Sequence, residues 1–356
     1  MAIFLIFLAI IIISNIEMPK TNQFNNDYID IRHTNVIKGI FVLLVLLGHS
    51  IQYISVKGPW DKPYLTFHDH IEQMVVSMFL FYSGYGMIIS VMKKGFSYIK
   101  TFPVKRFLIV LFNFDLVVLL FCLMNLCLKI HYDWKTILLS FTGWVGIGNS
   151  NWYMFAIFGL YIIFFLSFYL LRWYNGKGSL YLGMTLVTIL TVAFVYWEIR
   201  MGQPSWYYNT MILFAFGGWY ALFHEQVEKI LMKSDNIYFI AVIIITLFYW
   251  VSSKMKNYGG IEVYSIWAVV FTSAIVLATM KINIKSTFLE WIGQHVFSIY
   301  ILQRIPMIIF SKTGFTAGSP YAFVTISFII TLGLSVMFDY WVGKLDKCIL
   351  RVLLKE

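Results

Sequence analysis

The sequence predicts an all-α fold, a polytopic integral membrane helix bundle. Of its 356 residues, 60% are hydrophobic, 19% are aromatic and only 12% are charged, and the mean hydropathy is +0.77. This composition lies far from that of a soluble domain. Apolar runs that can cross the roughly 30 Å hydrocarbon core of a bilayer recur along nearly the whole chain. No loop between these runs is long enough to form a separate soluble domain.

About ten apolar runs are expected to form the core transmembrane helices. They occupy residues 36–56, 72–91, 107–128, 150–170, 180–197, 208–223, 237–253, 262–280, 288–310 and 321–342. The short segments between them contain turn and breaker residues, such as Gly202-Gln203-Pro204. We therefore expect one transmembrane domain over residues 36–342.

The two ends of the chain differ from this core. Residues 1–17 form a short apolar segment, which is either an additional helix or untranslated sequence if synthesis begins at Met18. The segment has neither the basic region nor the cleavage site of a signal peptide. Residues 18–35 are expected to form a polar cytoplasmic lead-in, and residues 343–356 a basic cytoplasmic tail.

Lysine and arginine residues predict the orientation of the bundle. Alternate loops hold 17 basic residues on one side and 8 on the other, and the richer side is expected in the cytoplasm. The remaining two, Lys38 and Arg304, lie inside predicted spans. This distribution accounts for the net charge of +10 without a nucleic-acid partner. We expect a multi-pass protein of the cell membrane, in bacteria the plasma membrane, with a cytoplasmic C-terminus.

Disulfide and metal chemistry are not indicated. Cys122 and Cys127 lie inside an apolar run and Cys348 lies near the C-terminus, so no disulfide framework emerges. The loop segment His68-Asp69-His70 offers two histidines and one carboxylate, which is a weak pattern for a metal site. We expect no bound metal and no bound cofactor.

Lys38 and His49 are the strongest candidates for chemistry. An ionisable side chain inside a transmembrane helix is costly and is by default a functional candidate. Eleven residues separate the two, and at about 100° per residue they share one helix face, roughly 16 Å apart along the axis. An imidazole can act as a general base toward a hydroxyl nucleophile. The alternative interpretation is that Lys38 snorkels to the interface and His49 donates to the helix backbone.

Four motifs, in order, resemble the membrane-bound acyltransferase family 3. The first is a basic residue, ten residues and then a histidine, formed by Lys38 and His49. The others are residues 79–85 (Phe-Leu-Phe-Tyr-Ser-Gly-Tyr), residues 151–154 (Asn-Trp-Tyr-Met) and residues 289–302, which begin Leu-Glu-Trp-Ile-Gly and end Phe-Ser-Ile-Tyr-Ile-Leu. Each motif alone is weak, but four in register are specific, and the resemblance covers roughly residues 35–342.

This resemblance implies transfer of an acyl group, usually acetyl, from cytoplasmic acetyl-coenzyme A to a hydroxyl of a cell-envelope saccharide. It identifies the essential histidine with His49 and its basic partner with Lys38. Near the third helix, Lys105 and Arg106 are candidates for binding the phosphates of the donor, although the family's Arg-x-x-Arg spacing is absent. An equally weighted interpretation makes them positive-inside anchors. Gln303 stands where many members have histidine, and it can hydrogen-bond but cannot exchange protons at neutral pH.

Other polar residues are secondary candidates for a pocket or tunnel. They are Ser83, Tyr85, Asn149, Trp152, Tyr300, Gln303 and Arg304. Aromatic belts explain tyrosine and tryptophan near span ends equally well. Asp115, in the third span, is expected to be a buried partner of Arg304 or Lys38 rather than a catalytic group.

Two other functions compete with acyl transfer. A membrane glycosyltransferase or polysaccharide polymerase would use acidic residues in the first outer loop, where Asp61 and Asp69 lie, but it leaves Lys38 and His49 unexplained. A secondary transporter would show internal repeats, and none is visible. The sequence leaves open the acceptor, the acyl group, the oligomeric state, and whether His49 is only a base or carries the acyl group.

Overall fold

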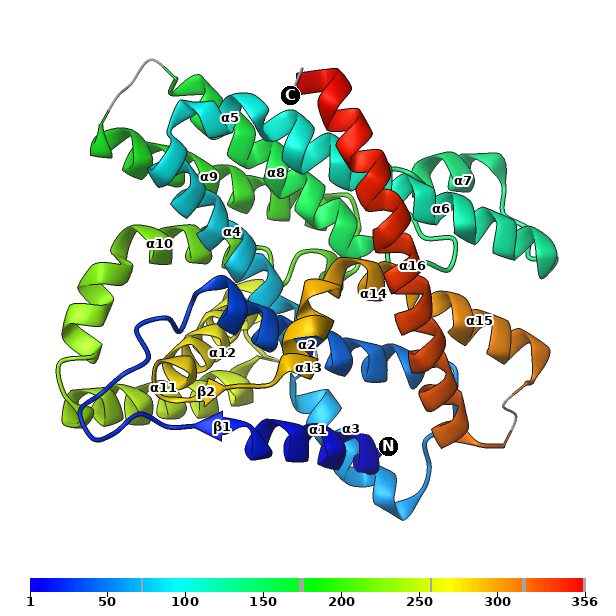
Figure 1. The fold of residues 1–356 in the computed structure, drawn as a ribbon, viewed down its shortest axis with the longest axis horizontal. Helices are drawn as coiled ribbons and strands as arrows, with labels where there is room; N and C mark the ends of the chain where they lie inside the picture. The colour runs from blue at the N-terminus through cyan, green and yellow to red at the C-terminus, as the bar shows by residue number, and fades with distance from the viewer. Residues whose placement is uncertain (72, 173–175, 257, 316–317, 355–356) are drawn as a thin grey trace.

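Helices form nearly all of the regular structure in the computed structural model, which describes residues 1–71, 73–172, 176–256, 258–315 and 318–354. In this part of the chain, eight helical stretches are long and apolar enough to cross a membrane. They contain α2, α4, α6, α8, α9, α11, α12 and α16. The prediction of an all-α polytopic bundle is therefore confirmed. In Figure 1, α2 and α4 cross the middle of the bundle, and α16 runs along its side.

The long helices are α2 (Ile31–Ser50), α4 (Met74–Lys94), α6 (Ile109–Cys127), α8 (Trp152–Leu170), α9 (Lys177–Arg200), α10 (Ile212–Leu231), α11 (Asp235–Met255), α12 (Gly260–Lys281) and α16 (Pro320–Leu354). Shorter helices are α1 (Ala2–Ser14), α3 (Lys62–Ile71), α5 (Phe96–Phe102), α7 (Trp134–Ser140), α13 (Thr287–Gln294), α14 (Val296–Leu302) and α15 (Arg304–Thr313). The turns η1 (Pro59–Asp61) and η3 (Ser205–Tyr207) are 3-10 helices, and η2 (Pro103–Leu108) is a π-helix. Two short strands, β1 (Ile16–Glu17) and β2 (Asn283–Ile284), pair antiparallel.

The predicted span 288–310 is three helices rather than one. It is divided into α13, α14 and α15, with breaks at His295 and Gln303. The second break has a local cause, because Pro306 has no N–H to donate to the carbonyl of Leu302 and its ring crowds that carbonyl.

The predicted span 208–223 has different bounds in the structure. Residues 208–211 form a turn, and α10 starts at Ile212 and continues into charged residues.

Glycines allow α13 to pack directly on α2. A Cβ atom on Gly39 would lie 2.1 Å from the carbonyl oxygen of Leu289, and one on Gly293 would lie 1.8 Å from the carbonyl oxygen of Asn35. Only glycine permits so close an approach of two backbones, which is a common device in membrane bundles. The helix that carries Lys38 is thereby held against the helix that precedes the first break.

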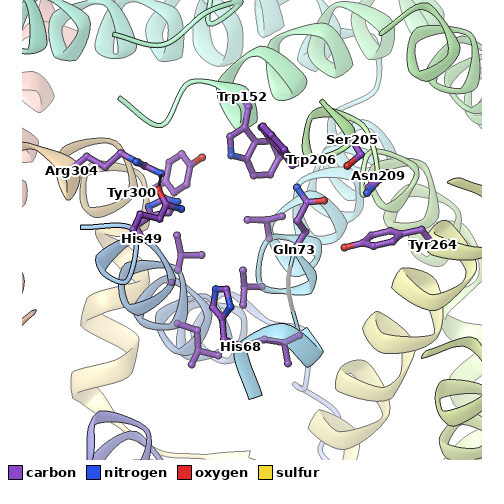
Figure 2. A pocket seen from close by; sticks show the side chains of 17 residues that line it. His49, His68, Gln73, Trp152, Ser205, Trp206, Asn209, Tyr264, Tyr300 and Arg304 are labelled. Atoms are coloured by element: carbon purple, nitrogen blue, oxygen red, sulfur yellow. Dashed lines mark hydrogen bonds between the residues drawn. The ribbon is translucent and has the colours of Figure 1, made fainter. Parts of the chain in front are cut away.

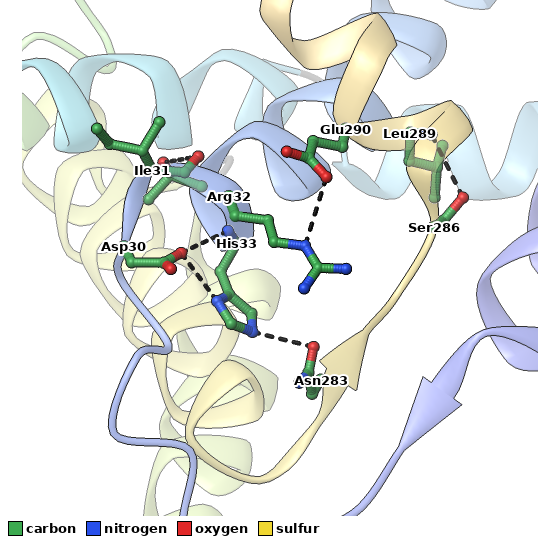
Figure 3. A network of polar contacts seen from close by, with 9 residues as sticks. Asp30, Ile31, Arg32, His33, Asn283, Ser286, Leu289 and Glu290 are labelled. Atoms are coloured by element: carbon green, nitrogen blue, oxygen red, sulfur yellow. Dashed lines mark hydrogen bonds and ion pairs between the residues drawn. The ribbon is translucent and has the colours of Figure 1, made fainter.

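A polar network holds the start of α2 against the segment before α13 (Figure 3). Asp30 caps α2, accepting hydrogen bonds from the backbone N–H of His33 at 2.7 Å and from its ring Nδ1 at 2.9 Å. The ring Nε2 lies 2.9 Å from Oδ1 of Asn283. Arg32 forms an ion pair with Glu290 at 3.4 Å. These contacts hold in place the N-terminal end of α2, which is the end nearer to Lys38.

The N-terminal segment is folded onto the bundle. Residues 1–17 form α1 and β1, and α1 lies beside α3 (Figure 1). The predicted lead-in, residues 18–35, already contains the first turn of α2, which begins at Ile31. The predicted tail, residues 343–356, continues α16 as helix to Leu354.

Candidate active site

His49 lies in the last turn of α2 and lines a cavity of about 540 Å³. Figure 2 shows its imidazole beside the ring of Tyr300, and the two ring centroids are 6.2 Å apart. The guanidinium of Arg304 lies next to the same pair. We call this space the His49 cavity.

The walls of the His49 cavity are rich in aromatic rings, amides and hydroxyls. These residues come from α3, α8, η3 and α12 and from the segments just after α2, just before α4 and just after η3, and they are Gln52, His68, Gln73, Trp152, Ser205, Trp206, Asn209 and Tyr264. Trp152 and Trp206 both line this space, as Figure 2 shows. Such walls combine flat apolar surfaces with groups that donate or accept hydrogen bonds.

A second cavity, of about 370 Å³, is lined by Lys38. The same wall includes Ser83 from α4 and Arg106 from η2, together with aromatic residues such as Tyr153 from α8. No carboxylate of the described residues lies within 4.0 Å of the Lys38 ammonium. We call this space the Lys38 cavity.

Among the residues that the structure describes, Tyr300 is the one that lines both cavities. It belongs to α14, between the two breaks of the predicted span 288–310. Its side chain is 5% exposed, and its hydroxyl makes no hydrogen bond of normal geometry among the described residues. Its ring packs edge-on against Tyr153, with centroids 5.5 Å apart. The Lys38 cavity and the His49 cavity therefore lie on either side of a wall that includes Tyr300.

Gln303 lies behind His49 and is fully buried. Its side-chain Nε2 donates a hydrogen bond to the Tyr300 carbonyl at 3.0 Å, and its carboxamide lies beside the His49 imidazole. Both its Oε1 and the Nδ1 of His49 are buried and make no hydrogen bond of normal geometry among the described residues. The carboxamide oxygen is thus available to Nδ1–H of a neutral imidazole.

Arg304 is held by neutral groups. Its Nε donates to the hydroxyl of Ser150 at 3.0 Å, and its two terminal nitrogens donate to the hydroxyl of Tyr53 at 3.0 Å and to Oε1 of Gln52 at 2.8 Å. The expected pairing of Arg304 or Lys38 with Asp115 is therefore not what the structure shows. The break at Gln303 lets Arg304 meet residues after the end of α2, whereas Oδ1 of Asp115 on α6 is buried without a partner among the described residues.

Four predicted site residues line neither cavity. Gln303 is one, and Lys105 is another, beside Arg106 in η2. Tyr85 points into a cluster with Phe81, Tyr220 and His224. Asn149 accepts a hydrogen bond from the backbone of Ile147 at 2.9 Å.

Sequence reasoning considered His68 only as a metal ligand, yet it lines the His49 cavity. His70 instead packs against Tyr249, with ring centroids 5.8 Å apart. Among the residues that the structure describes, no group of three or more His, Cys, Asp or Glu side chains could hold a metal. Trp206, Asn209 and Tyr264 were also missed, because no local pattern links them to His49.

Neither acidic residue of the first predicted outer loop lines the His49 cavity, although a carboxylate oxygen of Asp69 lies 3.5 Å from Nδ1 of His68, which does line it. Asp61 accepts a hydrogen bond from the Met1 ammonium at 2.6 Å, which lowers the pKa of its carboxyl. The side chain of Asp69 is exposed to 80%. These positions give no support to a catalytic pair of carboxylates.

A family model described as an acyltransferase domain matches residues 26–340. This range contains every residue that lines the two cavities. No curated protein and no solved structure gives a significant match to the chain.

Proposed function

The chain belongs to acyltransferase family 3, and from this premise we propose that it transfers acetyl from cytoplasmic acetyl-coenzyme A to a hydroxyl of an extracytoplasmic polysaccharide or glycan. The coarser description, a membrane acyltransferase, follows from the family match and the apolar helices. The observation that carries the finer proposal is that the Lys38 cavity and the His49 cavity share Tyr300 as a wall residue.

The Lys38 cavity suits the donor. Lys38 and Arg106 can pair with coenzyme A phosphates through charge-assisted hydrogen bonds. The aromatic and aliphatic walls between these cations and Tyr300 suit the pantetheine arm. The arm has to extend several helical turns, because Lys38 and His49 lie roughly 16 Å apart along α2. The thioester would then reach the level of Tyr300.

The His49 cavity suits the acceptor. Rings such as those of Trp152 and Trp206 can pack on the apolar faces of a sugar. Amide groups such as that of Asn209 can donate to and accept from its hydroxyls. Because the opposite side is richer in lysine and arginine, we place this cavity at the extracytoplasmic end of the bundle.

The chemistry requires one general base. With Nδ1–H of His49 directed to Gln303, the lone pair on Nε2 takes the proton of the acceptor hydroxyl. The acceptor oxygen attacks the thioester carbonyl carbon, forming a C–O bond. The C–S bond then breaks, and the coenzyme A sulfur leaves with the electron pair and accepts the proton from His49. The step balances in atoms and charge, and it needs no covalent intermediate in which His49 carries the acyl group.

Two measurements test the proposal. The protein, reconstituted in vesicles with [¹⁴C]acetyl-coenzyme A on the Lys38 side and a glycan acceptor on the His49 side, should release free coenzyme A and label the glycan in equal amounts. In cells, deleting the protein should remove O-acetyl signals from the NMR spectrum of the envelope polysaccharides. Unchanged acetylation with altered chain length would contradict acyl transfer and favour a polymerase.

A further inference from the structure

Tyr300 presents a poorly satisfied donor in the wall between the two cavities. Its hydroxyl is buried and makes no hydrogen bond of normal geometry among the described residues, and the polar group beside it is the hydroxyl of Ser150, although a buried polar group is normally hydrogen-bonded. The ring is fixed by contacts with His49 on one side and Tyr153 on the other. The hydroxyl is therefore held in place, at the boundary between the cavities, without a well-formed hydrogen bond to an acceptor.

Arg304 brings a positive charge to the same place. All three of its hydrogen bonds go to neutral oxygens, which orient the guanidinium without offsetting its charge. A guanidinium has five N–H donors, so donors remain beyond these three. Figure 2 shows the guanidinium beside Tyr300 and His49, and all three residues line the His49 cavity.

We propose that Tyr300 and Arg304 form an oxyanion hole for the acyl group. This inference rests on the function proposed above. When the acceptor oxygen bonds to the carbonyl carbon, the C=O π electrons move onto the carbonyl oxygen, which becomes an alkoxide. The Tyr300 hydroxyl donates a hydrogen bond to that oxygen and Arg304 stabilises its charge. When the C–S bond breaks, the C=O bond reforms and the charge leaves the site.

The break at Gln303 places the two proposed donors on consecutive short helices, Tyr300 on α14 and Arg304 on α15. In an unbroken helix, residues 300 and 304 would lie one turn apart on one face. The break at Gln303 turns Arg304 toward Tyr53 and Ser150, while Gln303 stays hydrogen-bonded to the Tyr300 carbonyl and beside His49. One short segment thus carries the proposed oxyanion donors and the residue that orients the base.

The test separates turnover from binding. We expect Tyr300→Phe, which keeps the ring, to lower kcat by about 10²–10³-fold, as the loss of one oxyanion donor does elsewhere. The KM values for acetyl-coenzyme A and for the acceptor should stay within about threefold, since the donor acts in the transition state. Arg304→Gln should also lower kcat, and Arg304→Lys should retain more activity than Arg304→Gln. Tyr238→Phe, which removes a buried hydroxyl outside both cavities, is the matched control.

The relative affinity for two inert donor analogues provides a second test. A mere loss of packing would not change this ratio of affinities. S-ethyl-coenzyme A has no carbonyl, so wild type and Tyr300→Phe should bind it equally. A coenzyme A analogue with a trifluoromethyl ketone in place of the thioester hydrates to a tetrahedral centre. Wild type should bind this analogue more tightly than S-ethyl-coenzyme A, and Tyr300→Phe should lose most of that preference.

The outcomes are distinguishable. If the wild-type protein moves no acetyl from acetyl-coenzyme A, the proposed function fails and the oxyanion hole fails with it. If transfer depends on His49 but Tyr300→Phe keeps its kcat and its analogue preference, only the oxyanion hole is overturned. If Arg304→Gln raises the acceptor KM at constant kcat, Arg304 binds the acceptor and the inference is wrong for that residue.

Discussion

The Lys38 cavity and the His49 cavity share one tyrosine but differ in the chemistry of their walls. The first combines two cations with aromatic and aliphatic side chains. The second combines two tryptophans with amides, hydroxyls and two histidines. A phosphate-bearing molecule with a long thin arm matches the first, and a polyhydroxylated molecule matches the second. The difference supports our proposal that two unlike substrates approach one reacting centre from opposite ends of α2.

The largest effect is expected at His49, which lines the His49 cavity beside Tyr300. His49→Ala removes the proposed general base and should lower kcat by about 10²–10⁴-fold. The measurement is coenzyme A release coupled to acetyl transfer in reconstituted vesicles. His70→Ala, in the same region but packed against Tyr249, is the control and should stay near wild type. Retained activity in His49→Ala would remove His49 from the mechanism.

Changes in the Lys38 cavity should affect the donor alone. Lys38→Ala removes a charge-assisted contact and should raise the KM for acetyl-coenzyme A by about 10–100-fold, with the acceptor KM unchanged. Lys38→Arg should recover part of this loss, because charge is retained. Initial rates at varied donor concentration measure the effect. An equal rise in both KM values would contradict the assignment of separate cavities.

A change at the crossing of α2 and α13 should affect both cavities, because α2 carries both Lys38 and His49. Gly39→Ala places a Cβ atom 2.1 Å from the Leu289 carbonyl oxygen, so α13 has to move away from α2. We expect a loss of about 1–3 kcal/mol in stability, seen as a lower melting temperature in detergent, and changes in both KM values. Gly86→Ala is the matched control, since a Cβ there has no non-local neighbour within 4 Å. A normal melting temperature for Gly39→Ala would contradict the tight crossing.

The smallest effect is expected at the rim of the His49 cavity. Trp206→Ala removes one stacking surface and should raise the acceptor KM by about threefold to tenfold, leaving the donor KM unchanged. Titration of both substrates checks this selectivity. Trp134→Ala, an exposed tryptophan in α7 that lines neither cavity, is the control. A change confined to the donor KM would reverse the assignment of the two cavities.

Local patterns predicted much of the fold. Long apolar runs indicated the membrane bundle, and the spacing of Lys38 and His49 on one helix identified the element around which both cavities are built. Hydropathy did not predict the two breaks in the span 288–310. The hydropathy of a residue depends on its type and not on whether the helix continues through it. Pro306 was the available signal for the second break.

The sequence did not predict which residues far apart in the chain contact one another. The expected partner of Arg304, Asp115, was chosen by charge, whereas the structure supplies Gln52, Tyr53 and Ser150. Neutral partners leave no charge pattern in a sequence. The same holds for Trp206 and Tyr264, which reach the His49 cavity from elements far along the chain.

The sequence by itself determined that this chain is a membrane helix bundle, and that one of its helices carries a lysine and a histidine three turns apart. Both properties are local, since burial in lipid depends on composition and the phase of a helix depends on residue spacing. Only the tertiary structure decided that these side chains serve two cavities which share Tyr300 in their walls. That arrangement requires α14 to be broken out of a longer helix and packed against α2, and its geometry depends on residues about 250 positions apart.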